Sequence, residues 1–132
     1  MPRTVAIPAD YVPGACNIGR AEIRRRRRGG VLLLAVTLAA WVWLVAADAA
    51  PGWFLALAVP ASLSAVGFLQ AAFRFCVHYG LLSLMGFGAV GATVAVEDEE
   101  ARRADRASSW RILAMSVLAG GLLALVAYTA AV

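Results

Sequence analysis

The chain has 132 residues, of which 62% are apolar and 15% are charged, with a mean hydropathy of +0.78. A soluble globular domain has roughly 45–50% apolar and ~25% charged residues, and it carries charge on every exposed helix face. Here nearly all the charges fall in two blocks, residues 3–28 and 97–111, with long apolar runs between and after them. This pattern argues against a water-soluble fold.

The net charge of +4 comes from twelve arginines, eight acidic residues and no lysine. A basic balance often indicates a nucleic-acid partner. Five of the arginines, however, directly precede an apolar run and have no aromatic residues among them, which is typical of a membrane surface. We therefore expect no nucleic acid, and we expect anionic lipid headgroups to contact Arg24, Arg25, Arg26, Arg27 and Arg28.

Residues 1–30 are predicted to form a cytoplasmic N-terminal segment. Its first nineteen residues contain three prolines and two glycines, which oppose regular structure, but their apolar side chains indicate that they pack on the rest of the protein. The arginine-rich stretch 20–28 is predicted to be a short helix with Gly19 as its N-cap. Glu22 and Arg26 are spaced to form an ion pair on this helix.

A transmembrane helical domain is predicted over residues 31–132, after a bend at Gly29 and Gly30. About 20 predominantly apolar residues are needed to cross ~30 Å of hydrocarbon. Three runs reach that length, at residues 31–50, 53–73 and 110–132. The predicted fold class is therefore an all-α integral membrane helical bundle with three transmembrane helices. Pro60 removes one backbone hydrogen bond, which predicts a kink in the second helix.

A fourth apolar segment, residues 75–96, is predicted either to span the membrane or to be re-entrant. If all four runs cross, eight arginines lie inside and the four in block 97–111 lie outside. If the segment returns on the side from which it entered, all twelve arginines lie inside. Hydropathy favours the first arrangement, whereas positive-inside bias favours the second, which we prefer. A polar helix is predicted over 97–109, and Ser108 or Ser109 is expected to cap the helix after it.

Three small residues on the last span, Ser116, Gly120 and Ala124, recur at every fourth position. They lie on one face of the helix, and such a face allows a second helix to approach closely. We predict a helix-packing role for them.

Two cysteines and the single histidine are the candidate chemical groups. In either topology Cys16, Cys76 and His78 lie on the same side of the membrane, where they could bind Zn or Cu(I) or act as a thiol redox pair. The favoured interpretation is that the cysteines are small buried apolar residues, that His78 is an interfacial side chain, and that no cofactor is bound. The sequence shows no nucleophile elbow, P-loop or dinucleotide-binding context, so no catalytic residue is predicted.

The stretches YVPGACNIGRAEIRRRR, GFLQAAFRFC and VEDEEARRADR, with an FG between the last two, resemble a family of small uncharacterised prokaryotic integral membrane proteins. The family pattern is a CNIGxxEI motif before an arginine-rich run and a GFLQxxFxFC motif. The resemblance covers residues from Tyr11 to about Arg111. It implies no known activity, and it implies a less hydrophobic, non-spanning third segment.

Three functions remain open from the sequence. The first is a non-enzymatic accessory or scaffold subunit, in a homo-oligomer or a larger membrane complex. The second is a membrane-bound metal-binding or redox module, and the third is a small oligomeric transporter, which usually needs a buried charge. In each case we expect a multi-pass protein of the inner membrane with a cytoplasmic N-terminus.

Overall fold

The computed structural model describes residues 10–132, and residues 1–9 of the predicted N-terminal segment lie outside the described residues. Three helical segments are long and apolar enough to cross a membrane, which confirms the three predicted spans by length and composition. The first is α1, Arg20–Ala46. The second combines a 3-10 helix, η1 (Pro51–Leu57), with α2 (Ala58–Phe73). The third is α4, Glu99–Ala131.

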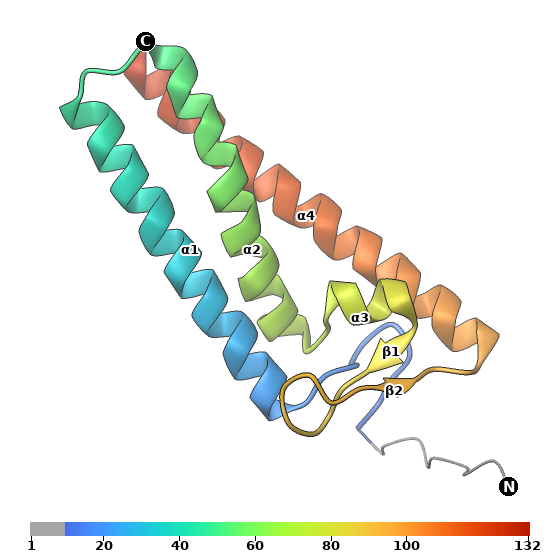
Figure 1. Ribbon diagram of the computed structural model, residues 1–132. Coiled ribbons are helices and arrows are strands. Elements are labelled where there is room, and N and C mark those ends of the chain that lie inside the picture. The colour runs from blue at the N-terminus through green and yellow to red at the C-terminus, as the bar shows by residue number, and fades with distance from the viewer. Residues whose placement is uncertain (1–9) are drawn as a thin grey trace, which may run out of the picture.

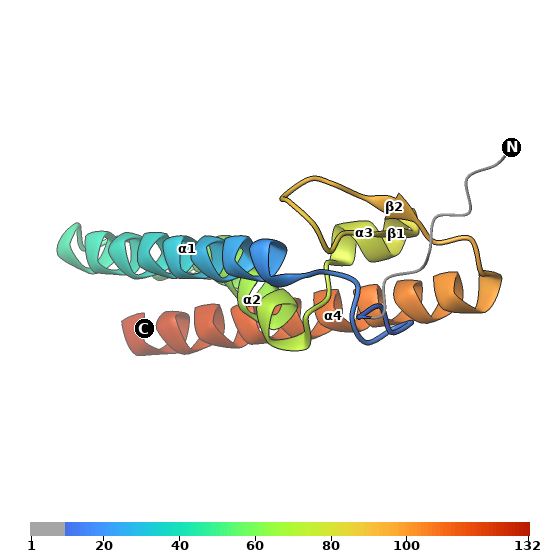
Figure 2. The same cartoon turned by 90° about the horizontal axis from the view of Figure 1, so that it is seen from below.

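The three long segments run side by side, with α2 lying between α1 and α4 (Figures 1 and 2). The turn between α1 and η1 lies at one end of the bundle together with the C-terminus (Figure 1). The segment before α1 and residues 74–98 lie at the other end. All the small, irregular parts of the described chain except that turn therefore gather at one end of the bundle.

Glycines bring α1 and α2 into close contact. A Cβ atom added to Gly67 on α2 would lie 2.7 Å from the Gly30 nitrogen and 2.8 Å from the Arg26 carbonyl oxygen on α1. The Ser64 hydroxyl donates a hydrogen bond of 2.8 Å to the Gly30 carbonyl. The predicted bend at Gly29 and Gly30 is wrong, because α1 continues through both glycines as one helix.

The contact between α2 and α4 depends on the predicted stripe of small residues. Ser116, Gly120 and Ala124 are all buried. A Cβ atom added to Gly120 would lie 2.6 Å from the backbone nitrogen of Ser62 on α2. The close approach that the stripe predicts is therefore made within this chain.

The second span changes its helix type close to Pro60. Residues before it form the 3-10 helix η1, and regular α-helix begins at Ala58. Because Pro60 has no N–H group, the carbonyl of Ala56 has no α-helical partner. The 3-10 to α transition lies two residues before this proline, and the kink predicted here stays a prediction.

Residues 75–96 do not form a membrane-spanning helix. They form the short helix α3 (Val77–Leu82) and two strands, β1 (Leu84–Met85) and β2 (Val94–Ala95). The strands pair antiparallel, with Leu84 opposite Ala95 and Met85 opposite Val94. The all-α prediction is corrected by this small sheet, and neither a spanning nor a re-entrant helix is formed by the segment.

Two residues in the left-handed conformation redirect the chain around this segment. Arg74 has φ of 54° and ends α2, and Ser83 has φ of 58° and ends α3. Because α2 ends at Phe73, the chain reverses direction there and enters α3, which lies beside α4 (Figure 1).

The last helix begins earlier than predicted. Asp98 is its N-cap, and its side chain accepts a hydrogen bond of 3.1 Å from the Ala101 amide. The polar stretch 97–109 is thus the start of α4, not a separate helix, and neither Ser108 nor Ser109 caps a helix. The side chains of both serines instead donate hydrogen bonds to backbone carbonyl groups.

Candidate functional site

We call the structured end of the bundle the head region. It comprises residues 10–19, α3, β1 and β2 with the loop between them, and the first turns of α1 and α4. Ile18 lies beside Gly86 in a parallel bridge, which joins the N-terminal segment to the loop. The head region contains the two buried carboxylates of the described chain, Glu22 and Asp105.

A buried carboxylate organises one half of the head region. Glu22, in the first turn of α1, is fully buried. Its Oε1 accepts a hydrogen bond of 2.9 Å from the Tyr79 hydroxyl and one of 2.8 Å from the Gly91 amide. Burial, and then the Glu22 hydrogen bond, raise the pKa of the Tyr79 phenol, so the phenol stays a neutral donor. Glu22 therefore ties α1 to both α3 and the loop between the strands.

Arg26 completes this cluster. Its Nη2 lies 3.2 Å from Glu22 Oε2, which confirms the predicted ion pair, and 2.9 Å from the Cys76 sulfur, to which it donates a hydrogen bond. Its guanidinium also lies 5.7 Å from the centre of the Tyr79 ring, within the range of a cation–π contact. Within the described chain Glu22 Oε2 accepts no hydrogen bond of good geometry, so the ion pair with Arg26 is its main compensation.

Asn17 joins the N-terminal segment to the turn after α2. Its side-chain amide donates to the Cys76 carbonyl at 3.2 Å, and its Oδ1 accepts from the Cys76 amide at 2.6 Å. Nearby, Gln70 Oε1 accepts from the Val77 amide at 2.9 Å. These side chains satisfy the backbone groups at the start of α3, which would otherwise be buried without partners.

A second buried carboxylate, Asp105 on α4, holds the start of the described chain. It accepts hydrogen bonds of 2.7 Å from both the Tyr11 hydroxyl and the Gly14 amide. The Ser108 hydroxyl donates to the Gly14 carbonyl. Burial, and then the hydrogen bond to Asp105, raise the pKa of the Tyr11 phenol well above its ordinary value. Ser109 hydrogen-bonds the Asp105 and Val77 carbonyls and so connects α4 to α3.

The three predicted metal or redox residues lie in different surroundings. Cys16 is half-buried, with its thiol directed to the Ile18 carbonyl at 3.7 Å, and burial raises the pKa of that thiol. Cys76 is buried under Arg26, whereas His78 is exposed. Both cysteines are free, and among residues 10–132 no three His, Cys, Asp or Glu side chains are close enough to hold a metal ion. The arrangement thus provides no support for the predicted use of these residues as a metal site.

The five consecutive arginines separate into different environments. Arg26 is directed into the cluster with Glu22 and Cys76. The others are exposed at the start of α1. Three of these, Arg24, Arg25 and Arg28, line a pocket of about 330 Å³ with Ala21 and with Val90 of the loop. The sequence predicted a headgroup contact for each of the five arginines, whereas the structure directs Arg26 toward Glu22 and Cys76.

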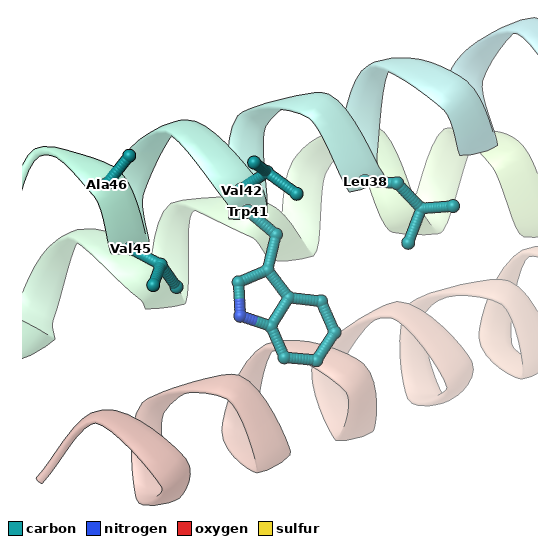
Figure 3. A pocket seen from close by; sticks show the side chains of 5 residues that line it. All are labelled: Leu38, Trp41, Val42, Val45 and Ala46. Carbon is teal, nitrogen blue, oxygen red and sulfur yellow. The ribbon is translucent and has the colours of Figure 1, made fainter.

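A second, apolar pocket of about 370 Å³ lies along the C-terminal half of α1 (Figure 3). Its lining residues all belong to α1 and are Leu38, Trp41, Val42, Val45 and Ala46. The Trp41 indole extends toward α4, across the space that separates α1 from that helix (Figure 3). The pocket contains no charged side chain and offers only apolar contact.

The side chains that sequence reasoning missed are Tyr11, Asn17, Tyr79 and Asp105. A signal for Asp105 was present. The small-residue stripe of α4 continues toward its N-terminus at three- and four-residue steps through Ile112, Ser109 and Asp105, which places Asp105 on the buried face. No comparable signal identifies Asn17 or Tyr79, because their partners are 59 and 57 residues away.

Comparisons of the chain with protein-family models, curated proteins and solved structures find no match.

Proposed function

We propose that this protein is a non-enzymatic accessory or scaffold subunit of the inner membrane. It crosses the membrane three times and holds the head region at the cytoplasmic surface. The observation that carries the proposal is that the buried reactive side chains are engaged in hydrogen bonds within the protein. Glu22, Cys76 and Asp105 are each bound to donors from other segments, and in this way they join those segments to one another.

An enzyme site of this size would need polar groups that converge on an open pocket. In the head region the buried carboxylates accept hydrogen bonds from the protein itself, and the pocket lined by Arg24, Arg25 and Arg28 contains no carboxylate, thiol or imidazole of the described residues. This arrangement is suited to a rigid surface that other molecules contact. It supports a structural role over the metal, redox and transport roles.

The proposed orientation is based on the distribution of arginine. All eleven described arginines lie in the head region, at the end of α2, or on the first part of α4 as far as Arg111. The turn at residues 47–50 at the other end of the bundle contains none. Positive-inside bias therefore favours a cytoplasmic head region and N-terminus.

The subunit role is tested by measuring the mass of particles taken directly from membranes. The full chain is extracted with a polymer that keeps the surrounding lipid, and the particles are analysed by native mass spectrometry. We expect more than one polypeptide in each particle, in a fixed ratio that survives addition of excess lipid before extraction. A single chain of 13.8 kDa in every preparation would contradict a subunit role.

A further inference from the structure

The pocket between α1 and the loop after β1 has a wall of three cations and a smaller apolar wall. Arg24, Arg25 and Arg28 provide the cations, and Ala21 and Val90 provide the apolar contacts. The volume of about 330 Å³ is at the lower end of the range for sites that hold small molecules.

The helix geometry explains why only three of the five arginines reach this pocket. Residues 21, 24, 25 and 28 are spaced three and four apart, so they share one face of α1. Glu22 and Arg26 share the adjacent face, which is directed into the head region. Arg27 is exposed but does not line the pocket.

The opposite wall is held in place by the buried carboxylate. Gly91 follows Val90, has φ of 88°, and donates its amide hydrogen to Glu22 at 2.8 Å. A positive φ of this kind favours glycine. The loop is thereby fixed against the first turn of α1, with Val90 beside the arginines. The hydrogen bond from Gly91 therefore positions the Val90 side of the pocket relative to α1.

The position of the pocket along α1 indicates the kind of ligand. Arg28 and Arg24 precede Val31, the first residue of the apolar run, by about 5 Å and 10 Å along the helix. The headgroup layer extends roughly 5–7 Å beyond the hydrocarbon on each side. The loop residues 86–93 carry no charge, and Val90 is half exposed. Arg28 thus lies at headgroup depth, and Arg24 lies a few ångströms beyond that layer on the aqueous side. Val90 lines the same pocket as both residues.

We propose that this pocket binds the phosphate of an anionic phospholipid, with Arg24, Arg25 and Arg28 as the donors. Guanidinium groups bind phosphate through charge-assisted, often paired hydrogen bonds. Free phosphate shares this chemistry, but it would gain nothing from Val90 or from the depth of the site. This inference rests on the proposed function, because it requires the head region to lie at a membrane surface.

The test measures lipid binding to the full-length protein in detergent by native mass spectrometry. The probes are phosphatidylglycerol, phosphatidylcholine and inorganic phosphate. We expect phosphatidylglycerol to bind more tightly than phosphatidylcholine, and inorganic phosphate not to displace it at equal concentration. Arg24→Gln, Arg25→Gln and Arg28→Gln should each weaken phosphatidylglycerol binding about tenfold or more, as expected for loss of a hydrogen bond to a charged group.

Arg27→Gln is the matched control, because it removes the same charge from the same helix outside the pocket. It should weaken binding by about fivefold at most, the effect of one arginine near an anionic surface. Equal losses in all four variants would overturn the pocket and leave a diffuse basic surface. Displacement by an equal concentration of inorganic phosphate would overturn the lipid assignment, and so would equal affinity for the two lipids.

Failure of this inference can be distinguished from failure of the proposed function. The subunit role is judged by the number of chains in membrane-derived particles, which this titration does not measure. The melting temperature of each variant in the same detergent shows that a loss of binding is not a loss of fold. We expect these temperatures to equal that of the unmodified protein, because the three side chains are exposed.

Discussion

The Tyr79 hydroxyl donates a hydrogen bond of 2.9 Å to the Glu22 carboxylate, although 57 positions separate the two residues. The same carboxylate oxygen accepts from the Gly91 amide, so one side chain on α1 fixes both α3 and the loop. The arginine pocket depends on this arrangement, because Val90 is placed by its neighbour Gly91.

Tyr79→Phe should destabilise the head region by about 1.5–3 kcal/mol, because a buried carboxylate loses a donor. The measurement is the free energy of unfolding in detergent. Tyr128→Phe is the control, since the Tyr128 hydroxyl donates no hydrogen bond to the described residues and the residue packs against the apolar cluster of Leu44 and Ala124. Equal stability of the two variants would show that the Tyr79 hydrogen bond contributes nothing.

The raised pKa of the Tyr11 phenol predicts a loss of stability at alkaline pH. Burial and Asp105 raise the pKa of its phenol above the ordinary value of 10.0, so the folded state favours the neutral form. The stability from this group is fully present below pH 10 and is lost as the pH rises toward the raised pKa. The melting temperature of the unmodified protein should therefore fall more steeply above pH 10 than that of Tyr11→Phe.

Tyrosinate absorbance provides a second measure of the same group. Tyr11→Phe should remove a component that titrates only above the range of an ordinary phenol. If both proteins show the same titration and the same dependence of melting temperature on pH, Tyr11 is not held by Asp105 as described.

Two adjacent glycines on α4, Gly120 and Gly121, allow the effect of helix packing on stability to be measured separately from the effect of helix propensity. Gly120→Ala should destabilise the bundle by about 1–3 kcal/mol, because the added methyl group meets the backbone of Ser62 on α2. Gly121→Ala meets nothing within 4 Å, so it should be neutral or stabilise the helix by up to ~1 kcal/mol. Thermal unfolding followed by helical circular dichroism compares them. An equal response would argue against the α2–α4 contact.

Gly29 and Gly30 form a second matched pair, on α1. Gly29→Ala has open space and should be tolerated or stabilise α1 by up to about 1 kcal/mol. Gly30→Ala places a methyl group 3.1 Å from both the ring and the backbone nitrogen of Phe68, and because the backbone cannot move aside easily, the change should destabilise the α1–α2 contact. Unfolding midpoints in detergent report both effects. Loss of stability in Gly29→Ala would support a functional bend and contradict a continuous α1.

The sequence predicted the parts of this fold that depend on neighbouring residues. The three spans follow from apolar length, and both the N-cap at Gly19 and the Glu22–Arg26 pair follow from local spacing. The stripe of Ser116, Gly120 and Ala124 indicated a close helix contact because small residues on one face leave room for a backbone.

The parts that failed depend on distant partners. Apolar composition cannot distinguish a segment that crosses lipid from one that folds against other segments of the protein, so it predicts a fourth membrane segment over residues 75–96. Gly30 is small because Phe68 and Gly67 approach it and not because the chain bends. Ser108 was expected at a helix end, but Gly14, 94 positions earlier, accepts its hydrogen bond. No local pattern contains that information.

The central claim is that the chain crosses the membrane three times and leaves residues 75–96 on the same side as the arginines. It is tested by labelling single introduced cysteines with a membrane-impermeant maleimide in a Cys16→Ser background, in which the remaining native cysteine, Cys76, is buried. The probes are exposed positions, Ala50→Cys in the turn after α1, Ala89→Cys in the loop, and Ala107→Cys on α4. We predict labelling of Ala50→Cys in intact spheroplasts and of the other two only in inside-out vesicles; labelling of Ala107→Cys in spheroplasts would contradict the account.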